Sequence, residues 1–380
     1  MTAAIWRNCK LGDVITLKRG YDLPEQDRKA GPFPIVSSSG ITDHHAEAKV
    51  KGPGVVTGRY GTLGEVFYLQ GDFWPLNTSL YVQDFKGNDP RFVSFFLRLL
   101  NFGTKNAAGA VPGVNRNHLH AMDVRVPSLP IQRRIADILS AYDDLIENNQ
   151  RRIKILEEMA RSLYREWFVH FRFPGHDKVK MVPSLLGPIP QGWDVKPLEE
   201  LATVTMGLSP KGDTYNEEEN GTPLVNGPVE FGDRFTKRMK WTTEPTKVCK
   251  EGDLVVCVRG STTGKYVKSD GVYCLGRGVC GISSKYQCFI ELLFENELPT
   301  LLGQTSGSTF PSWTGPQIKS HRVLSPPAEV IAQFDVLVKP MSAAVLGYSR
   351  QIQNLRCTRD LLLPRLLSGQ IELKSMEAVA

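Results

Sequence analysis

The segment "VCVRGSTTGK" at residues 256–265 has the residue types of a phosphate-binding loop. Such a loop needs four residues between two glycines, then Lys and Ser or Thr, because its backbone N–H groups surround the phosphates and its hydroxyl binds Mg²⁺. Here Gly260 and Gly264 enclose only three residues, and Tyr266 follows Lys265 where Ser or Thr would be needed. The segment therefore does not predict a nucleotide site.

Patterns for other chemistry are also missing from the sequence. It contains neither an Asn-Pro-Pro-Tyr/Phe tetrapeptide for amino methylation nor an F-x-G-x-G cofactor loop. Its seven histidines form no recognisable triad or metal-ligand spacing, and none of its seven cysteines forms a C-x-x-C pair. We therefore predict no catalytic, cofactor-binding or metal-binding residues, and reduced, mostly buried thiols.

The composition is that of a globular protein of more than one domain. The chain has 380 residues, of which 41% are hydrophobic and 23% charged. Its net charge of +6 is compatible with nucleic-acid binding and equally with an ordinary solvated surface. We see no secretory signal and no run near the roughly 18 apolar residues that a membrane helix needs, so we expect a cytoplasmic protein that does not associate with membranes.

The two halves of the chain repeat one another. "WRNCKLGDVITLKRG" (6–20) matches "WDVKPLEELATVTMG" (193–207), and "GVVTGRYGTLGE" (54–65) matches "DLVVCVRGSTTGK" (253–265). The offset grows from about 187 to about 200 residues, which indicates an insertion in the second half, near "NEEENG". A period this long predicts a duplicated domain.

Each copy begins with a mixed part and ends in a long helix. Short β-branched and aromatic runs with Gly, Pro and Asn between them predict strands and turns, and "PRFVSFFLRLLNF" and "CFIELLFENEL" each predict one helix. Apolar residues at alternating spacings of three and four then predict a long helix with a coiled-coil seam. The predicted helix-pairing seam consists of Ile138, Leu145, Asn149, Ile153 and Leu156 in the first copy and Met341, Tyr348, Ile352 and Leu355 in the second.

The fold class that follows is a mixed α/β (α+β) fold with two duplicated globular domains. They are separated by two long helices that pair antiparallel, with an approximate two-fold relation between the halves. Asn149 and Arg359 are polar residues of the seam and need partners there. The predicted segments are a first globular domain over 1–128, a central helix over 129–176, a second domain over 177–326 and a C-terminal helix over 327–380.

This arrangement resembles the specificity subunit of type I restriction-modification systems. The resemblance is carried by "GDLVVCVRGSTTGK" and its partner "GPGVVTGRYGTLGE", by "VPGVNRNHLHAMDVRVPSLPIQRRIADIL" where a domain joins its helix, and by "RDLLLPRLLSGQI" (359–371). It extends over essentially the whole chain, twice. The first copy departs from the pattern at Pro53, where Asp253 stands in the second, and "PPAEVIAQ" lacks the usual Glu-Gln pair.

The resemblance implies two target-recognition domains that each read one half of a split site in double-stranded DNA. It also implies two methyltransferase subunits, which methylate adenine N6, and motor-nuclease subunits; S-adenosylmethionine, ATP and Mg²⁺ would bind those partners. The subunit itself would carry no catalysis. A DNA-binding or scaffold protein without such partners, a nucleotide-dependent enzyme and a subunit of methylation-only machinery remain alternatives.

We expect the DNA contacts on loop residues beside the glycine turns, because Arg and Lys suit guanine and Asn suits adenine. In the first copy the candidates are Ser37, Ser38, Ser39, Arg59, Tyr60, Asn115 and Arg116, and in the second Asn226, Arg259, Lys265, Arg277, Trp313 and Thr314. The serines are equally compatible with a plain turn, Trp313 with the core, and the matching pair Arg59 and Arg259 with ion pairs that support the fold.

Overall fold

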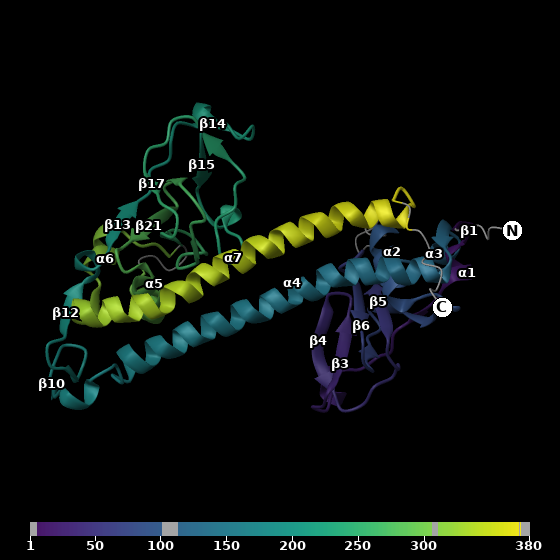
Figure 1. Cartoon of the computed structure of the whole chain (residues 1–380), viewed down its shortest axis with the longest axis horizontal. Helices are drawn as coiled ribbons and strands as arrows, with labels where there is room; N and C mark the ends of the chain where they lie inside the picture. Colours follow the sequence, from purple (N-terminus) through teal and green to yellow (C-terminus); the bar gives the residue numbers. More distant parts are fainter. Residues whose placement is uncertain (1–5, 101–112, 306–310, 372, 374–380) are drawn as a thin grey trace, which may run out of the picture. The chain divides into compact units, whose positions relative to one another are not determined.

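The computed structural model describes residues 6–100, 113–305, 311–371 and 373, and these divide into two compact units. Unit 1 comprises residues 1–149 and 350–380, and unit 2 comprises residues 150–349. Each unit contains a set of strands and one part of each long helix (Figure 1). The mixed helix and strand content agrees with the predicted fold class.

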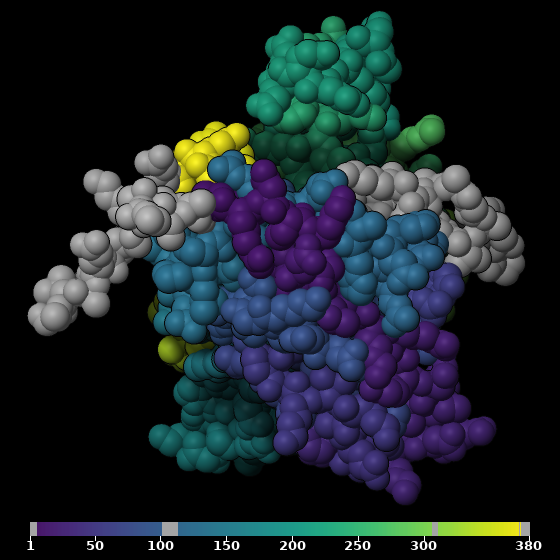
Figure 2. All heavy atoms as spheres, turned by 90° about the vertical axis from the view of Figure 1, so that its right-hand side faces the viewer, coloured from purple at the N-terminus to yellow at the C-terminus, as the bar shows by residue number. Residues whose placement is uncertain are grey.

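Unit 1 is built on a four-stranded antiparallel sheet in the order β2-β8-β5-β6. The central strand β5 has the sequence "GVVTG", and all of its residues are buried. The β2–β8–β5–β6 strands span Thr16–Arg19, Ser79–Asp84, Gly54–Gly58 and Val66–Leu69. Two smaller sheets join β1 (Trp6–Lys10) with β9 (Asp123–Pro127), and β4 (Gly40–His45) with β3 (Phe33–Ser37) and β7 (Trp74–Pro75). Figure 2 shows the face on which β1, in purple, and the blue segment that contains β9 lie together.

Three short or medium helices complete unit 1. They are α1 (Leu11–Val14), α2 (Pro90–Leu100) and α3 (Arg116–His120). The side chains of α2 are buried over most of the helix, with Phe92 and Leu97 fully inaccessible. The apolar run "PRFVSFFLRLL" forms the predicted helix because it packs one broad face on the sheet.

Unit 2 repeats this plan. Its four-stranded sheet has the order β13-β21-β18-β19, which matches β2-β8-β5-β6 strand for strand. These strands span Thr203–Met206, Val279–Ser283, Leu254–Cys257 and Tyr266–Lys268. The pair β12 (Asp194–Pro197) and β22 (Arg322–Ser325) matches β1 and β9. The duplication predicted from the sequence is therefore confirmed at the level of sheet order.

The second copy has a larger accessory sheet, but its insertion does not lie near "NEEENG" (216–221) as predicted. Val225 pairs with Leu275 as Val36 pairs with Pro75 in unit 1, and the extra residues lie between Val225 and Leu275. In unit 2 this sheet has five strands, in the order β14 (Tyr215–Asn216), β16 (Trp241–Thr242), β15 (Thr222–Val225), β20 (Tyr273–Leu275) and β17 (Val248–Cys249), against three in the corresponding sheet of unit 1. Unit 2 also contains the short pair β10 (Met181–Val182) and β11 (Ile189–Pro190), and the helices α5 (Gln287–Gly303) and α6 (Gly315–Ser320). The helix predicted over "CFIELLFENEL" is thus confirmed as part of α5.

The two long helices are α4 (Leu129–Tyr164) and α7 (Ala328–Leu367). A π-helical turn at Arg165–Val169 follows α4, so residues 170–176 lie outside the helix that we expected to reach residue 176. Within unit 1 the helices pair antiparallel, because Asp143 contacts Arg359 and Asn149 contacts Gln351. Within unit 2 the direction is the same, since Tyr348 lies near Arg152 and Phe334 lies near Tyr164.

The polar seam residues have the partners that the sequence required. The Asn149 side-chain amide donates to Gln351 Oε1 at 3.2 Å, and Arg359 Nη1 donates to Asp143 Oδ1 at 2.5 Å. Among the apolar seam residues, Ile153 and Ile352 are buried, while Ile138, Leu156, Met341, Tyr348 and Leu355 are half-buried. These positions agree with the predicted seam.

Leu145 was predicted to lie in the seam, and the structure places it outside. Its side chain is 51% exposed, and the adjacent Ile146 is 7% exposed in its place. In α7 an exposed leucine likewise precedes a buried residue, since Leu337 is 48% exposed and Val338 is buried. The packed stripe moves because a straight α-helix has 3.6 residues per turn rather than the 3.5 of a strict heptad, and it drifts around the helix.

From the sequence we expect no segment apolar enough to span a membrane, and α7 departs from that expectation. Within α7 an 18-residue window reaches a mean hydropathy of 1.4, which by length and composition is enough for a membrane span. One such helix is weak support for a span, and the core helix of a domain passes the same test. Here Phe334 and Val338 of α7 are buried in the core of unit 2, and the Asp335 carboxylate accepts a hydrogen bond from the backbone N–H of Phe289. Part of the apolar surface of α7 is thus packed against protein, while Val336 and Leu361 are exposed.

Candidate nucleic-acid interface

The glycine segment 256–265 is the turn of a β-hairpin. It connects the antiparallel strands β18 and β19, and its ends are joined by hydrogen bonds from Cys257 N–H to Lys265 O (2.8 Å) and from Gly264 N–H to Cys257 O (2.9 Å). A phosphate loop instead joins a strand to a helix. The matching turn of unit 1 joins β5 to β6 in the same way.

Both turns are joined by backbone hydrogen bonds or β-bridges to the segment that precedes the short helix of their unit. Val114 N–H donates to Arg59 O (2.9 Å), and Tyr60 forms an isolated β-bridge with Gly113. In unit 2, Arg259 forms the equivalent bridge with Ser312. The sheet thus places the turn arginine beside the start of α3 in unit 1 and of α6 in unit 2.

Unit 1 has a cleft of about 500 Å³ at this place. Four of the predicted contact residues line it together, and the sequence analysis missed a fifth, Arg19 at the end of β2. The cleft residues are Arg19, Arg59, Tyr60, Asn115 and Arg116, over a floor that includes Leu80. Three guanidinium groups around one concavity favour an anionic or acceptor-rich ligand such as DNA.

The cleft side chains differ in how firmly they are held. The Arg59 guanidinium lies over the Tyr60 ring, 4.6 Å from its centroid. The Asn115 side chain accepts from Asn117 N–H (2.9 Å) and so acts as the N-cap of α3, which leaves its NH₂ group as the donor for a base. Nearby, burial together with the charges of Arg116 and Lys86 lowers the pKa of His120, whose Nε2 accepts from Leu17 N–H.

The three serines have separate roles. Ser37 is buried; its hydroxyl donates to Gly40 O and accepts from Ser39 N–H, so it holds the β3–β4 turn and does not reach DNA. This is a correction to the predicted contact set, and the turn interpretation is the right one for Ser37. Ser38 lies near the glycines of the 58–61 turn, and Ser39 is exposed.

In unit 2 three of the predicted contact residues lie on the surface. Arg259, Lys265 and Arg277 are exposed, and Asn226 packs against Gly276 and Gly278 on either side of Arg277. Thr314 caps α6 through its hydroxyl. These positions leave the surface basic and open.

Trp313 is a second correction. Its side chain is 2% exposed, and its indole N–H donates to Leu301 O at 3.0 Å. The residue therefore belongs to the core of unit 2. Its ring packs edge-on against Phe294. A sequence alone does not distinguish a buried aromatic residue of this kind from an exposed one in a loop.

Arg59 and Arg259 do not occupy matching places, because Val258 stands where Arg59 stands, and the ion-pair interpretation of these arginines lacks support. In the described part of the chain, no carboxylate forms an ion pair with Arg59 or with Arg259.

The departure from the family pattern at Pro53 has a physical explanation. The Asp253 carboxylate accepts from Lys250 N–H before β18, and in unit 1 the carboxylate of Asp72 instead accepts from Gly52 N–H before β5.

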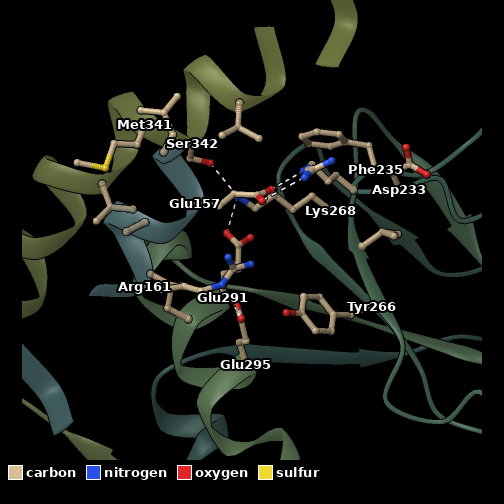
Figure 3. Close-up of a pocket in the computed structure, with 17 residues that line it drawn as sticks. Glu157, Arg161, Asp233, Phe235, Tyr266, Lys268, Glu291, Glu295, Met341 and Ser342 are labelled. Carbon is tan, nitrogen blue, oxygen red and sulfur yellow. Dashed lines mark hydrogen bonds and ion pairs between the residues drawn. The ribbon is translucent and has the colours of Figure 1, made fainter. Parts of the chain in front are cut away.

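A second pocket, of about 380 Å³, lies in unit 2 among α4, α5, α7 and β19 (Figure 3). Six of its charged side chains form three pairs: Glu157 with Arg234, Arg161 with Glu295 (2.7 Å), and Lys268 with Glu291. Lys268 Nζ also donates to Ser342 Oγ at 2.7 Å. This network attaches α5 and β19 to the long helices, and nothing in it resembles a nucleophile with its base.

Metal-ligand clusters are not found within the described residues, and the cysteines there are free. Five of them, from Cys249 to Cys288, are buried. Burial raises the pKa of Cys257 to about 11, which keeps the thiol protonated and unreactive.

Comparison with known proteins gives a consistent picture. Residues 5–158 and 190–334 both match the family described as "Type I restriction modification DNA specificity domain". The chain is 26% identical over 300 residues to the putative type I restriction enzyme MjaX specificity subunit of Methanocaldococcus jannaschii; the match spans 76% of this chain and 69% of that protein. It is 22% identical over 345 residues to the HindI specificity subunit of Haemophilus influenzae, across 70% of this chain and 73% of the relative.

A solved structure shares the fold. It is the crystal structure of the type I restriction-modification system S subunit from M. genitalium, with a TM-score of 0.68, 14% sequence identity and coverage of 97% of each chain. The family match occupies both repeats of the chain and well over half of its length. The chain therefore belongs to the type I restriction-modification DNA specificity family, and it is a non-catalytic specificity subunit.

Proposed function

We propose that each unit's recognition fold reads one half of a bipartite site in double-stranded DNA. The observation that supports this proposal is that both units have the same sheet order but carry different residues at matching positions. Arg59, Tyr60 and Asn115 in unit 1 stand where Val258, Arg259 and Thr314 stand in unit 2. The same scaffold with different loop chemistry supports two different half-sites separated by an unread gap.

The long helices supply the second part of the proposal. We propose that they set the gap between the half-sites and dock two methyltransferase subunits that methylate adenine N6, with motor-nuclease subunits joining for cleavage. S-adenosylmethionine, ATP and Mg²⁺ would be held by those partners, in the cytoplasm. Exposed apolar residues on α4 and α7, such as Ile155, Met159 and Leu361, are available for such partners.

Exchange of one recognition domain tests the proposal. Residues 1–128 should be replaced by the corresponding domain of a relative, and host DNA should be sequenced for modified bases with and without each gene. We expect one half of the methylated motif to change and the other half, with the gap, to remain. A motif changed in both halves would contradict independent recognition, and a chain that binds DNA tightly but supports no methylation would favour a protein without methyltransferase partners.

A further inference from the structure

The three arginines of the unit 1 cleft are held in different ways. Arg19 Nη2 donates to Asp22 Oδ1 at 3.3 Å, and the Asn77 side-chain amide donates to the same oxygen. Asp22 therefore has two donors, and it restricts the direction of the Arg19 guanidinium. Arg59 only lies over Tyr60, and among the described residues no carboxylate pairs with Arg116.

This difference separates two kinds of DNA contact. A guanine edge presents two acceptors, O6 and N7, in one plane, so an arginine that reads it must hold its paired donors in a fixed orientation. A phosphate accepts hydrogen bonds from many directions, and a guanidinium that is free to turn serves it well. Arg19 meets the first requirement, whereas Arg59 and Arg116 meet the second.

We propose that Arg19 reads a guanine in the first half-site, with Asp22 and Asn77 as its positioning residues, and that Arg59 and Arg116 contact the flanking phosphates. The inference rests on the proposed function and adds to it the base and the residue. Arg19 pairs with Leu80 in the β2–β8 ladder, at the edge of the cleft, and no predicted contact residue occupied this strand end.

Unit 2 has no arginine at the position that corresponds to Arg19. Met206 ends β13 at the position where Arg19 ends β2, and it pairs with Cys280 as Arg19 pairs with Leu80. A thioether offers no hydrogen-bond donor to a base. Readout by an arginine at this strand end is thus confined to the half-site of unit 1.

The test uses Arg19→Lys and Arg19→Ala in the full chain, together with the partners that it is expressed with. Arg59→Ala is the phosphate comparison, and Arg7→Ala, an exposed arginine of β1 outside the cleft, is the matched control. Modified-base sequencing gives the motif, binding to matched oligonucleotides at several salt concentrations gives the affinity, and thermal unfolding reports the fold. Asp22→Ala tests positioning, since Arg19 remains present.

We expect both Arg19 variants to relax one guanine of one half-site, with discrimination falling about 5- to 150-fold. Lysine should not rescue it, because it cannot form the paired contact. Asp22→Ala should weaken the same position only. Arg59→Ala should lower affinity for all sequences and reduce the salt slope by about one.

A motif unchanged by Arg19→Lys and Arg19→Ala, in chains that unfold at the wild-type temperature, would overturn the assignment. Rescue of the guanine preference by lysine would do the same, because it would leave only a phosphate contact. Absence of a methylated motif with the wild-type chain would instead contradict the proposed function.

Discussion

At the scale of single residues, one histidine shows how the recognition fold depends on a neutral side chain. His120 Nε2 accepts the N–H of Leu17, next to the strand end that carries Arg19. Its burial and the positive charges of Arg116 and Lys86 lower its pKa. A protonated ring could not accept that hydrogen bond, so the cleft geometry requires the neutral form.

Acid should therefore destabilise unit 1 through His120. Above the ordinary histidine pKa of about 6.5 the ring is neutral in both the folded and the unfolded chain, and its hydrogen bond is fully available. As the pH falls through that value, the unfolded chain binds a proton that the folded chain resists, and stability is lost. His120→Gln keeps an acceptor without titrating, so its urea midpoint should fall less than that of the wild type between pH 7.5 and pH 5.5. Equal falls in the two proteins would contradict this role.

At the scale of elements, charged side chains attach each recognition fold to the long helices. In unit 1 the two oxygens of Asp143 on α4 accept from Arg98 of α2 (3.4 Å) and Arg359 of α7 (2.5 Å). In unit 2 the polarity is reversed, with Arg161 on α4 and Glu295 on α5. The apolar stripes supply most of the packing, and these pairs fix the register of the elements that they join.

The corrected seam predicts different costs for two neighbouring substitutions on α4. Ile146→Ala should lower the free energy of unfolding by about 2–4 kcal/mol, because it leaves a cavity in a buried stripe. Leu145→Ala removes a side chain that is 51% exposed, and it should cost less than about 0.5 kcal/mol. Urea denaturation of the two variants gives the comparison. A larger loss of stability for Leu145→Ala than for Ile146→Ala would contradict the corrected seam and support the strict heptad.

At the scale of the whole molecule, the chain divides between Asn149 and Gln150 and between Ser349 and Arg350. Both long helices continue across these points. If they set the gap between the half-sites, the length of helix at the division fixes the number of unread base pairs. Each helical residue adds about 1.5 Å, and each base pair about 3.4 Å.

Lengthening both helices should therefore lengthen the gap in the DNA site. Four residues inserted near Gln150 and four near Ser349 add about 6 Å and nearly one full turn, so the packed stripe stays close to its original phase. The two half-sites should be kept, and the unread gap should grow by one or two base pairs. Modified-base sequencing reads both quantities. Methylation only at the original spacing would show that the helices do not set the distance.

The sequence by itself determined the duplication, the glycine turns and the course of the long helices. These features are local or periodic: the spacing of apolar residues, the turns and the failed phosphate-loop pattern are readable along the chain. The partners of Asn149 and Arg359 were also required in advance, because a polar residue in an apolar stripe is costly without one.

Only the tertiary structure decided which side chains face outward. Trp313 is in the core and Ser37 closes a turn, while Arg19 reaches the cleft, although their sequence surroundings predicted the first two as contacts and overlooked the third. Ile146 replaces Leu145 in the packed stripe because that stripe drifts around a straight helix. Exposure depends on neighbours that are not adjacent in sequence, such as Leu301, 12 residues from Trp313, and Asn77, 55 residues from Asp22. No local pattern encodes those contacts.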